Sequence, residues 1–357
     1  MKNPISASST FVLFYSSLFF LLCFTSSAFG QKGIRLNTPE AFDGYKLCTA
    51  DNGRTYLLDN CGEIVNTWFN TFPRYYCRLT EEGDLIYING NNIIVKDWNS
   101  NIVGTISVNS SNLVLTYEVM KLENGNYLAA CRRIRDAEYF KSIGWNLNNS
   151  VADRTDGVVE IDPSGNIVWE WNIGDHTIQD VKSSVSNYGN ISEHPELVDV
   201  NAISEFDWNF QESFMINGID YNQELDQILL SVRKVSEIMV IDHSTTTEEA
   251  KGSAGGNSGK GGDFLYRWGN PQNYGQGNES DRVLYYQHNP NWVKYGDHKG
   301  KIIVYNNGLD RIVPGAGTIS SVHIVDPPVT GSGNYTLSQG EAFEPISADI
   351  TIDKVST

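Results

Sequence analysis

The residues with the clearest chemical potential are one histidine and one arginine. His288 lies within residues 284–308 (LYYQHNPNWVKYGDHKGKIIVYNNG), among several aromatic residues. A neutral imidazole that is held by its neighbours is a competent nucleophile and can take up a sulfuryl or phosphoryl group. Arg233 follows the apolar run 227–232, and its guanidinium offers planar, forked donors that suit a tetrahedral oxyanion. Together these two side chains could hold and transfer a charged group.

Each of these residues also has a purely structural interpretation. His288 could be a hydrogen-bonded histidine packed among aromatic rings, and Arg233 could be a surface arginine at a strand end. His176, His194 and His243 stand beside acidic residues and are expected to serve local structure. The fold around each residue therefore has to distinguish chemistry from packing.

The composition and the pattern around His288 favour strands. The chain has 357 residues, of which 11% are aromatic and 32 are glycine, and aromatic side chains suit pleated, half-buried surfaces. Residues 284–308 are expected to form a hairpin-like pair, with His288 on its first strand and a turn at Gly300 and Lys301. An all-β protein follows from these features.

A ten-residue repeat is the clearest pattern in the chain. Residues 59–68 (DNCGEIVNTW) and 162–171 (DPSGNIVWEW) share the template Asp-x-x-Gly-x-Ile-Val-x-x-Trp. Residues 97–106 (DWNSNIVGTI) fit it with Ser100 in place of Gly and Ile106 in place of Trp. An apolar run precedes each aspartate, so each repeat predicts a strand, a turn and a second strand.

A second template precedes the first and completes a four-stranded unit. Residues 78–87 and 121–128 both read as strand, Gly turn and strand. The two templates in sequence give four antiparallel strands, which is the blade of a β-propeller. The expected blades fall near residues 44–68 (partial), 72–106, 113–172, 213–269 and 284–325. We therefore expect about five recognisable blades, the last of which is incomplete. Residues 331–357 would have to begin a further blade. The alternative fold is a β-sandwich.

The propeller interpretation brings distant residues together. The first strand of each blade lies innermost and lines the central channel, and these strands carry Tyr117, Met215 and His288. Two insertions, near residues 137–155 and 173–209, are expected to form loops above the mouth of the channel.

Residues 1–30 differ in kind from the rest. Lys2 is followed by the apolar run 11–24 and by small residues up to Gly30. The run is short for a membrane span, so we expect a removed signal peptide, followed by a propeller domain over residues 31–357. The mature protein would then be periplasmic or secreted, with no membrane association once the signal is removed.

The cysteines, the net charge and a glycine-rich segment limit which cofactors and partners are expected. Cys48, Cys61, Cys77 and Cys131 allow two disulfides in any of three pairings, and their spacing does not suit zinc, so no metal is expected. The net charge of −17 opposes binding to nucleic acid. Residues 251–263 are rich in glycine but do not match a phosphate-binding loop, and are interpreted as a flexible connector. No cofactor is expected.

Several longer runs resemble the bacterial aryl-sulfate sulfotransferases. They are residues 171–180, 194–197, 217–232, 242–250 (DHSTTTEEA), 255–263 (GGNSGKGGD), 266–272 (YRWGNPQ) and 287–288. The resemblance extends from about residue 37 to residue 345. It implies a six-bladed propeller that moves a sulfuryl group from one phenol to another through a sulfated histidine, without a nucleotide sulfate donor.

The same resemblance assigns residues to roles. His288 matches the nucleophile of the family and Arg233 the arginine that holds the sulfuryl oxygens. Two family histidines are replaced, one by Met215 and the other by Tyr117; a thioether cannot donate a proton, whereas a phenol can. The predicted site is listed in two groups: catalytic His288, Arg233 and Tyr117, and substrate-binding Met215, Asn217 and Glu118.

Two functions remain open from the sequence. The first is an exported arylsulfotransferase with an aryl sulfate donor and a phenolic acceptor. The second is a catalytically impaired family member that binds sulfated or aromatic ligands in its channel, which the replacements at Met215 and Tyr117 favour. A propeller that only binds other proteins is a third, weaker option. The sequence also leaves open a homo-oligomer.

Overall fold

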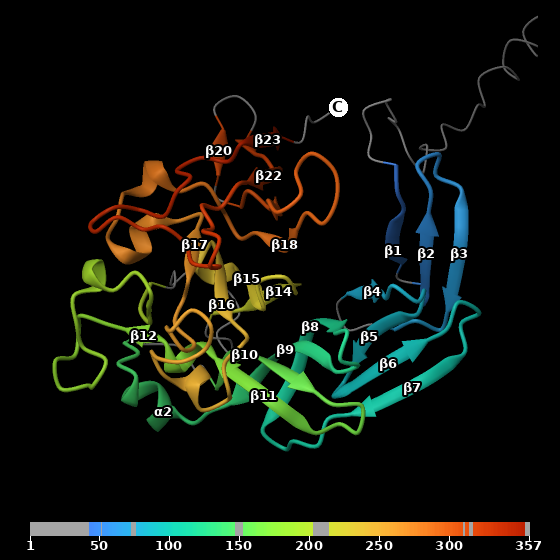
Figure 1. The fold of residues 1–357 in the computed structure, drawn as a ribbon, viewed down its shortest axis with the longest axis horizontal. Coiled ribbons are helices and arrows are strands. Elements are labelled where there is room, and N and C mark those ends of the chain that lie inside the picture. The colour runs from blue at the N-terminus through green and yellow to red at the C-terminus, as the bar shows by residue number, and fades with distance from the viewer. Residues whose placement is uncertain are drawn as a thin grey trace, which may run out of the picture. The chain divides into compact units, whose positions relative to one another are not determined.

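The computed structural model describes residues 43–50, 52–72, 76–146, 153–202, 214–309, 311–313 and 317–353. The expected signal peptide lies outside these residues. The chain divides into two compact units, one formed by residues 1–46 and 57–65 and the other by residues 47–56 and 66–357. The second, called the large unit below, contains most of the strands (Figure 1). In the described part of the chain no helix is long and apolar enough to span a bilayer.

The strands form five blade sheets. The first has three strands, β1 (Lys46–Ala50), β2 (Arg54–Leu58) and β3 (Ile64–Phe69), in the order β1-β2-β3. The other four have four antiparallel strands each: β4 (Cys77–Leu79), β5 (Leu85–Asn89), β6 (Asn92–Lys96) and β7 (Ile102–Ser107); β8 (Leu113–Lys121), β9 (Tyr127–Ile134), β10 (Arg154–Ile161) and β11 (Ile167–Asn172); β14 (Ile216–Asn222), β15 (Gln227–Val232), β16 (Glu237–Asp242) and β17 (Tyr266–Trp268); β18 (His288–Trp292), β19 (Ile302–Asn306), β22 (Ser321–Val325) and β23 (Ile350–Asp353). The prediction of an all-β propeller with about five blades is confirmed.

The ten-residue repeat has a local physical cause. In each copy the aspartate carboxylate accepts hydrogen bonds from the backbone N–H groups two and four residues later, at 2.8–2.9 Å. The fourth residue takes a left-handed conformation, with φ of 88° at Gly165 and 72° at Ser100. A Cβ atom at Gly165 would lie 2.1 Å from the carbonyl oxygen of Ser107, so glycine is required there. Ser100 shows that a small polar residue tolerates the same turn.

The core lies between neighbouring blades of the large unit. One cluster joins the second and third blades, another the third and fourth, and another the fourth and fifth. Leu229 and Leu230 of β15 are both fully buried, and they belong to different clusters. Because successive side chains of a strand point to opposite faces, a blade that packs between two neighbouring blades buries both faces of its sheet. Strands such as β15 and β16 therefore read as continuous apolar runs.

The fifth blade extends further than its sequence indicated. Strand β23 pairs with β22, with Ile350 opposite Ile324 and Asp353 opposite Ser321. The expectation that this blade ends near residue 325 and that residues 331–357 begin another is wrong. The long connection buries Tyr335 against Tyr266, with ring centroids 4.9 Å apart, and then returns as the fourth strand. Because β23 is a short strand after a long irregular segment, no turn template in the sequence predicts it.

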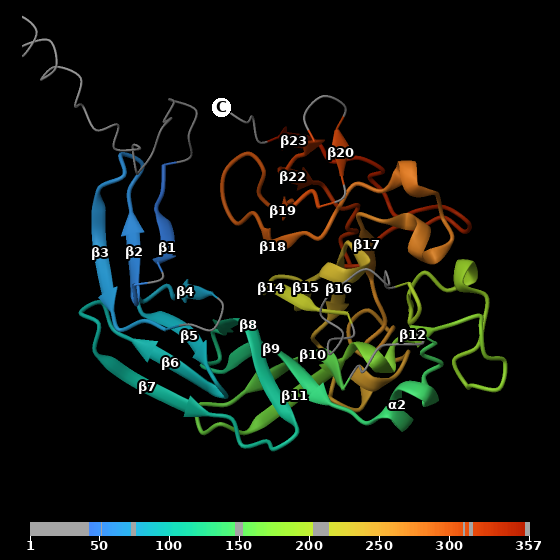
Figure 2. The same cartoon turned by 180° about the vertical axis from the view of Figure 1, so that it is seen from behind.

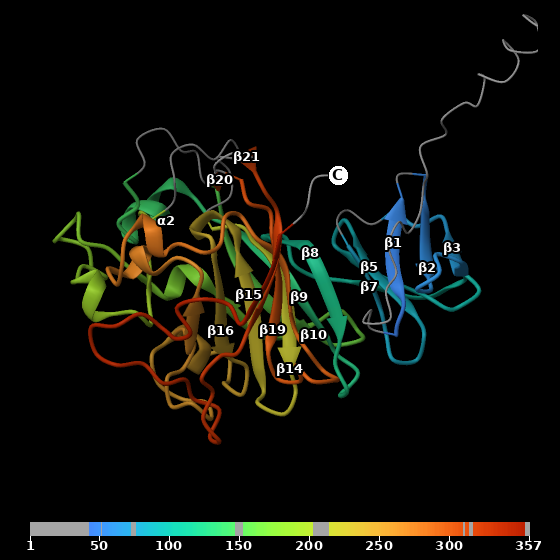
Figure 3. The ribbon, with the colours of Figure 1, turned by 90° about the horizontal axis from the view of Figure 1, so that it is seen from above.

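The insertions contain short elements. Helix α2 (Ala137–Ser142) lies between β9 and β10, and β10 begins at residue 154, slightly earlier than predicted. Between β11 and β14 the chain forms η1 (Ile173–Asp175), β12 (Thr177–Ile178), η2 (Ile191–Glu193) and β13 (Val198–Asp199). Residues 147–152 and 203–213 of the two insertions lie outside the described part. Figure 3 shows α2 at the same end of the large unit as the hairpin of β20 (Ile312–Val313) and β21 (Gly317–Thr318).

The glycine-rich segment 251–263, interpreted from sequence as a flexible connector, is folded back on itself. The backbone N–H of Gly261 donates to the carbonyl of Gly255 and that of Gly262 to the carbonyl of Gly252. The carboxylate of Asp242 accepts a hydrogen bond from the backbone N–H of Ser258 at 2.8 Å. The segment is therefore a structured loop between the last two strands of its blade.

The cysteines do not form the disulfides that their number allowed. Cys48, Cys61, Cys77 and Cys131 are all free thiols. Cys131 is 1% exposed within an apolar cluster on β9, whereas Cys48 and Cys61 are exposed, so the thiols lie in different environments. Burial raises the pKa of Cys131 well above its usual range, which makes it unreactive. The described residues also contain no cluster of side chains suited to hold a metal ion.

Candidate active site on the innermost strands

The topology gathers several predicted site residues at one end of the large unit. Met215 immediately precedes β14, Arg233 immediately follows β15, and His288 begins β18. Because β14 and β15 are antiparallel neighbours, the start of one lies beside the end of the other. Strands β14 and β18 lie side by side (Figures 1 and 2), and the Asn217 side-chain amide donates to the carbonyl of Gln287 at 2.9 Å. Three sequence segments thus meet next to His288.

The innermost strands share an irregularity at this level. Their register breaks at the site: in β8 between Leu115 and Val119, in β14 between Ile216 and Gly218, and in β18 between His288 and Asn291. Tyr117, Met215 and Asn289 have φ of 51°, 62° and 51°. A left-handed backbone is strained for residues other than glycine, and such strain concentrates at functional sites. Bulges of this kind re-aim side chains.

His288 has the properties of a neutral imidazole. The residue is half-buried, and its buried Nδ1 has no hydrogen-bond partner among the described residues. Burial and then the positive charge of Arg233 lower the pKa of His288, and polar contacts with Asn307 and the backbone of Tyr286 offset this only in part. The side chain therefore stays unprotonated at neutral pH, which is the form in which an imidazole acts as a nucleophile.

Arg233 lies between β14 and the segment that leads into β18. Its backbone N–H donates to the carbonyl of Met215 at 3.0 Å, and its Nη1 lies 3.7 Å from the sulfur of Met215. Its guanidinium carbon is 4.7 Å from the ring centre of Tyr286, two residues before His288. Met215, Arg233, Tyr286 and His288 thus form one group around a cation.

Four buried polar atoms on the innermost segments have no hydrogen-bond partner in the described part of the chain: Thr116 Oγ1, Asn217 Oδ1, Gln287 Oε1 and His288 Nδ1. Buried polar atoms are otherwise nearly always paired in proteins, because each unpaired one costs free energy. Thr116, Asn217 and Gln287 are each at most 1% exposed. Such a concentration on neighbouring strands is typical of a place where a ligand or solvent completes the bonding.

A cavity of about 620 Å³ adjoins this group. Tyr286 of this group lines it together with Lys234 and Val235, whereas His288, Arg233 and Met215 are not part of the lining. Residues of the 173–209 insertion, including Asp180 and Asp199, also line it. Arg282, which sequence reasoning did not single out, also lines it; its guanidinium carbon is 4.2 Å from the ring centre of Tyr285. The signal that could have revealed Arg282 is its position three residues before two consecutive tyrosines.

Tyr117 and Glu118 are adjacent in sequence but have different surroundings. Tyr117 is buried, with the guanidinium carbon of Arg132 5.4 Å from its ring centre. The carboxylate of Glu118, predicted to bind substrate, accepts the backbone N–H of Ile219 at 2.7 Å and lies 3.5 Å from Arg78. Arg78 also contacts Asp220 at 3.2 Å. Glu118 is therefore engaged in holding neighbouring blades together.

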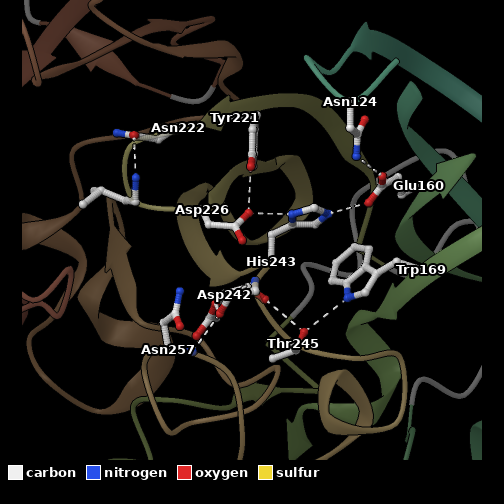
Figure 4. A network of polar contacts seen from close by, with 12 residues as sticks. Asn124, Glu160, Trp169, Tyr221, Asn222, Asp226, Asp242, His243, Thr245 and Asn257 are labelled. Atoms are coloured by element: carbon white, nitrogen blue, oxygen red, sulfur yellow. Dashed lines mark hydrogen bonds and ion pairs between the residues drawn. The ribbon is translucent and has the colours of Figure 1, made fainter. Parts of the chain in front are cut away.

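Two other histidines have structural surroundings. His243 Nδ1 contacts Asp226 at 2.7 Å and its Nε2 contacts Glu160 at 3.1 Å, which links the fourth blade to the third (Figure 4). Burial alone would lower the pKa of His243, but the two carboxylates raise it to about 9. His176 is buried between Asp263 and the carbonyl of Ala250. Both histidines are bonded through both ring nitrogens, in contrast to His288.

The fold and the site together define a β-propeller that has a half-buried histidine and an arginine on its innermost segments. The chain matches the model of the arylsulfotransferase (ASST) family over residues 18–316, and it belongs to this family. Membership supports sulfotransferase activity, with an aryl sulfate and a phenol as the small-molecule substrates. No curated protein matches the chain by sequence.

Solved structures resemble the chain only distantly. A protein of unknown function from Bacteroides caccae is 9% identical with a TM-score of 0.37, and the match covers 85% of this chain and 95% of that one. A streptogramin B lyase is 10% identical with a TM-score of 0.37, covering 86% of each chain. Hydrazine synthase from Kuenenia stuttgartiensis is 12% identical with a TM-score of 0.36, covering 74% and 64%. These likenesses carry no argument about function.

Proposed function

We propose that the protein transfers a sulfuryl group from an aryl sulfate to a phenol, with His288 as the group that carries it between the two. The observation that supports this most strongly is the state of His288: a half-buried imidazole with a lowered pKa, beside Arg233, in a member of the arylsulfotransferase family. A neutral nucleophile and a fixed cation are the two groups that the reaction needs.

In the first step the donor is cleaved. His288 Nδ1 is buried, so Nε2 is the nitrogen that attacks sulfur. The N–S bond forms as the S–O bond to the aryl group breaks, and the phenoxide leaves with the electron pair of that bond. Arg233 faces the sulfuryl oxygens and stabilises the negative charge that they share in the transition state.

In the second step the group moves to the acceptor. The oxygen of a second phenol attacks sulfur, the N–S bond breaks, and the electron pair returns to Nε2. The phenolic proton is lost to solvent or to a nearby base. The imidazole is regenerated, so the reaction needs no nucleotide donor and follows ping-pong kinetics.

The replacement of a family histidine by Met215 limits which donors react well. The thioether contacts Arg233 but cannot protonate a departing phenoxide. Tyr117 is buried beneath Arg132, and its phenol is the remaining acid of the predicted set. We therefore expect donors with acidic leaving phenols, such as 4-nitrophenyl sulfate, to react far better than phenyl sulfate.

The cavity beside Tyr286 is the proposed route for substrate. Lys234 and Arg282 line it and offset the carboxylates of Asp180 and Asp199 in the same lining, in a chain whose net charge is −17. An anionic sulfate ester would otherwise be repelled by this net charge. We further propose that residues 1–30 are a signal peptide and that the mature protein acts in the periplasm or outside the cell. Sequencing the N-terminus of the protein recovered from outside the cytoplasm tests this.

The decisive experiment is to trap the sulfated histidine. Purified protein is mixed briefly with 4-nitrophenyl sulfate, quenched at alkaline pH, digested and analysed by mass spectrometry. We expect a mass increase of one sulfuryl group on the peptide that contains His288, and its disappearance when phenol is added. His288→Ala must lack the modified peptide, whereas His194→Ala, which changes a histidine that is 46% exposed, must retain it. Equal transfer by both variants would remove His288 from the mechanism.

A second candidate function is supported by one observation. Met215 and Tyr117 replace two histidines that the family uses, and a protein without these donors could bind sulfated or aromatic ligands without turning them over. It predicts that 4-nitrophenyl sulfate raises the melting temperature while no nitrophenol is released. Detection of sulfated His288 would exclude this function.

A further inference from the structure

A buried ion pair lies beside the site without belonging to the predicted site residues. Arg132 of β9 and Asp156 of β10 are direct partners across the two strands. Their side chains are 2% and 0% exposed, and Arg132 Nε lies 3.2 Å from Asp156 Oδ1. Because removing two charges from water costs free energy that their attraction need not offset, a buried ion pair is not explained by stability alone.

The carboxylate of Asp156 reaches out of its own blade to the start of the next one. It accepts hydrogen bonds from three consecutive backbone N–H groups, those of Phe214 at 3.0 Å, Met215 at 2.8 Å and Ile216 at 3.2 Å. Consecutive amides can converge on one anion only in a curved backbone that includes a left-handed residue. Met215, with φ of 62°, is that residue. The carboxylate therefore balances the strain of the turn.

The turn held by Asp156 in turn positions Arg233. The carbonyl of Met215 accepts the backbone N–H of Arg233 at 3.0 Å, and the carbonyl of Phe214 accepts that of Lys234 at 3.1 Å. These two bonds anchor the start of η3 (Arg233–Val235). The sulfur of Met215 also lies against the guanidinium of Arg233. The turn at residues 214–216 thus positions both the backbone and the side chain of Arg233.

We propose that Arg132 and Asp156 are positioning residues for Arg233. They do not touch the substrate; they hold the turn at Met215 so that the Arg233 guanidinium stays beside Tyr286 and His288. Arg132 also lies over the ring of Tyr117, so the same pair reaches another predicted catalytic residue. The inference rests on the proposed function, because it concerns the residue that holds the sulfuryl oxygens.

The test is a double-mutant cycle between Asp156 and Arg233. Asp156→Asn keeps the shape but loses the charge and one acceptor oxygen. Since a displacement of about 1 Å can lower a rate about a hundredfold, we expect kcat/KM for 4-nitrophenyl sulfate to fall by about 10- to 100-fold. In the Arg233→Ala background the same change must cost less than about twofold, because residues that act through one another are not additive. Additive losses would overturn the proposal.

A matched control separates positioning from stability. Glu160→Gln weakens another interblade ion pair, the one with His243, without touching the turn at Met215. We expect it to lower the melting temperature while kcat/KM stays within twofold. If Asp156→Asn does not fold, Arg132→Lys replaces it, since this variant keeps the charge but loses the planar guanidinium, and it must show the same non-additivity with Arg233→Ala.

The proposal can fail independently of the proposed function. Binding of 4-nitrophenyl sulfate to proteins that also carry His288→Ala, measured by calorimetry, gives the same cycle without turnover. Hydrogen exchange supplies a readout without any ligand: Asp156→Asn must speed exchange at the amides of residues 214–216 and 233–234, while Glu160→Gln leaves them unchanged. Coupling in binding without transfer would retain the positioning role and reject the reaction. Transfer with additive losses would support the proposed reaction and reject the positioning role.

Discussion

The first strands β4, β8, β14 and β18, with the residues beside them, carry two groups of polar side chains that differ in how completely they are bonded. In one group, Arg78, Glu118 and Asp220 join three blades, and the other carboxylate oxygen of Asp220 accepts the backbone N–H of Trp292 at 2.8 Å. In the other group, around His288, several buried polar atoms have no hydrogen-bond partner among the described residues, and the backbone is left-handed at several points. In the first group, called the interblade tie below, the charged side chains pair with one another.

This difference separates stability from function on the same strands. Burial alone would lower the pKa of Arg78, but Glu118 and Asp220 raise it, so the cation is strongly held. Burial lowers the pKa of His288, and no carboxylate among the described residues opposes this shift. Charges that are paired hold the blades together, whereas a histidine that is left neutral and incompletely bonded is ready to react. Substitutions in the two groups should therefore affect different measurements.

His288→Ala is expected to have the largest effect on the reaction. Without the nucleophile, transfer from 4-nitrophenyl sulfate should fall by at least about a thousandfold. The free energy of unfolding should change by less than about 1 kcal/mol, because a surface or loosely bonded side chain contributes little. Both are measured on the same preparation, by nitrophenol release and by urea unfolding. A loss of stability as large as that of an Arg78 variant would contradict the comparison.

Arg78→Met should show the opposite pattern. It leaves two buried carboxylates without their cation, and breaking a buried pair in this way costs about 3–5 kcal/mol. Urea unfolding measures the loss, and methionine keeps an unbranched apolar stem in place of the lower part of the arginine side chain. The matched control is Lys121→Met, which breaks a more exposed pair with Glu82 and should cost less than about 1 kcal/mol. Equal costs for the two variants would show that the interblade tie is not special.

Met215→His should sharpen the comparison by adding a donor to the reactive group. An imidazole at this position could hydrogen-bond the sulfuryl oxygens or the departing phenoxide, and one such donor is worth roughly 3–4 kcal/mol elsewhere. Since the strain at Met215 remains, we expect a gain of about tenfold, larger for phenyl sulfate than for 4-nitrophenyl sulfate. Met215→Leu is the control without a donor. A gain equal for both donors would place the histidine away from the leaving group.

The smallest effect on the reaction is expected from the titration of His243. Its pKa is raised to about 9 from an ordinary value near 6.5, so its contribution to stability is complete below pH 6.5 and is lost as pH rises through about 9. The change is on the order of 1–3 kcal/mol. Urea unfolding across this range measures it, and His243→Gln should remove the slope. Transfer activity normalised to folded protein should not follow this titration.

The sequence revealed the parts of the fold that depend on neighbouring residues. The aspartate turns are closed by contacts within five residues, with a glycine or Ser100 at the left-handed position. Such turns can be read from spacing alone, and they gave the blade pattern and the position of His288 on a first strand. The last blade was misjudged because β23 follows a long irregular connection. The number of cysteines suggested disulfides, but four thiols can pair only if the fold brings them together.

The site was predicted only as a set of residues, since its bonding depends on contacts across the chain. Arg132 and Asp156 meet because β9 and β10 are neighbours, and Asp156 reaches Met215, 59 positions further along the chain. Arg78 meets Asp220 across 142 positions. No spacing pattern in the sequence predicts such partners. Sequence by itself determined the all-β blades, because hydrogen bonds inside turns and short apolar runs are local. Tertiary structure alone decided that Glu118 is bound to Arg78 while His288 is left neutral, because burial and the approach of distant charges set the protonation state.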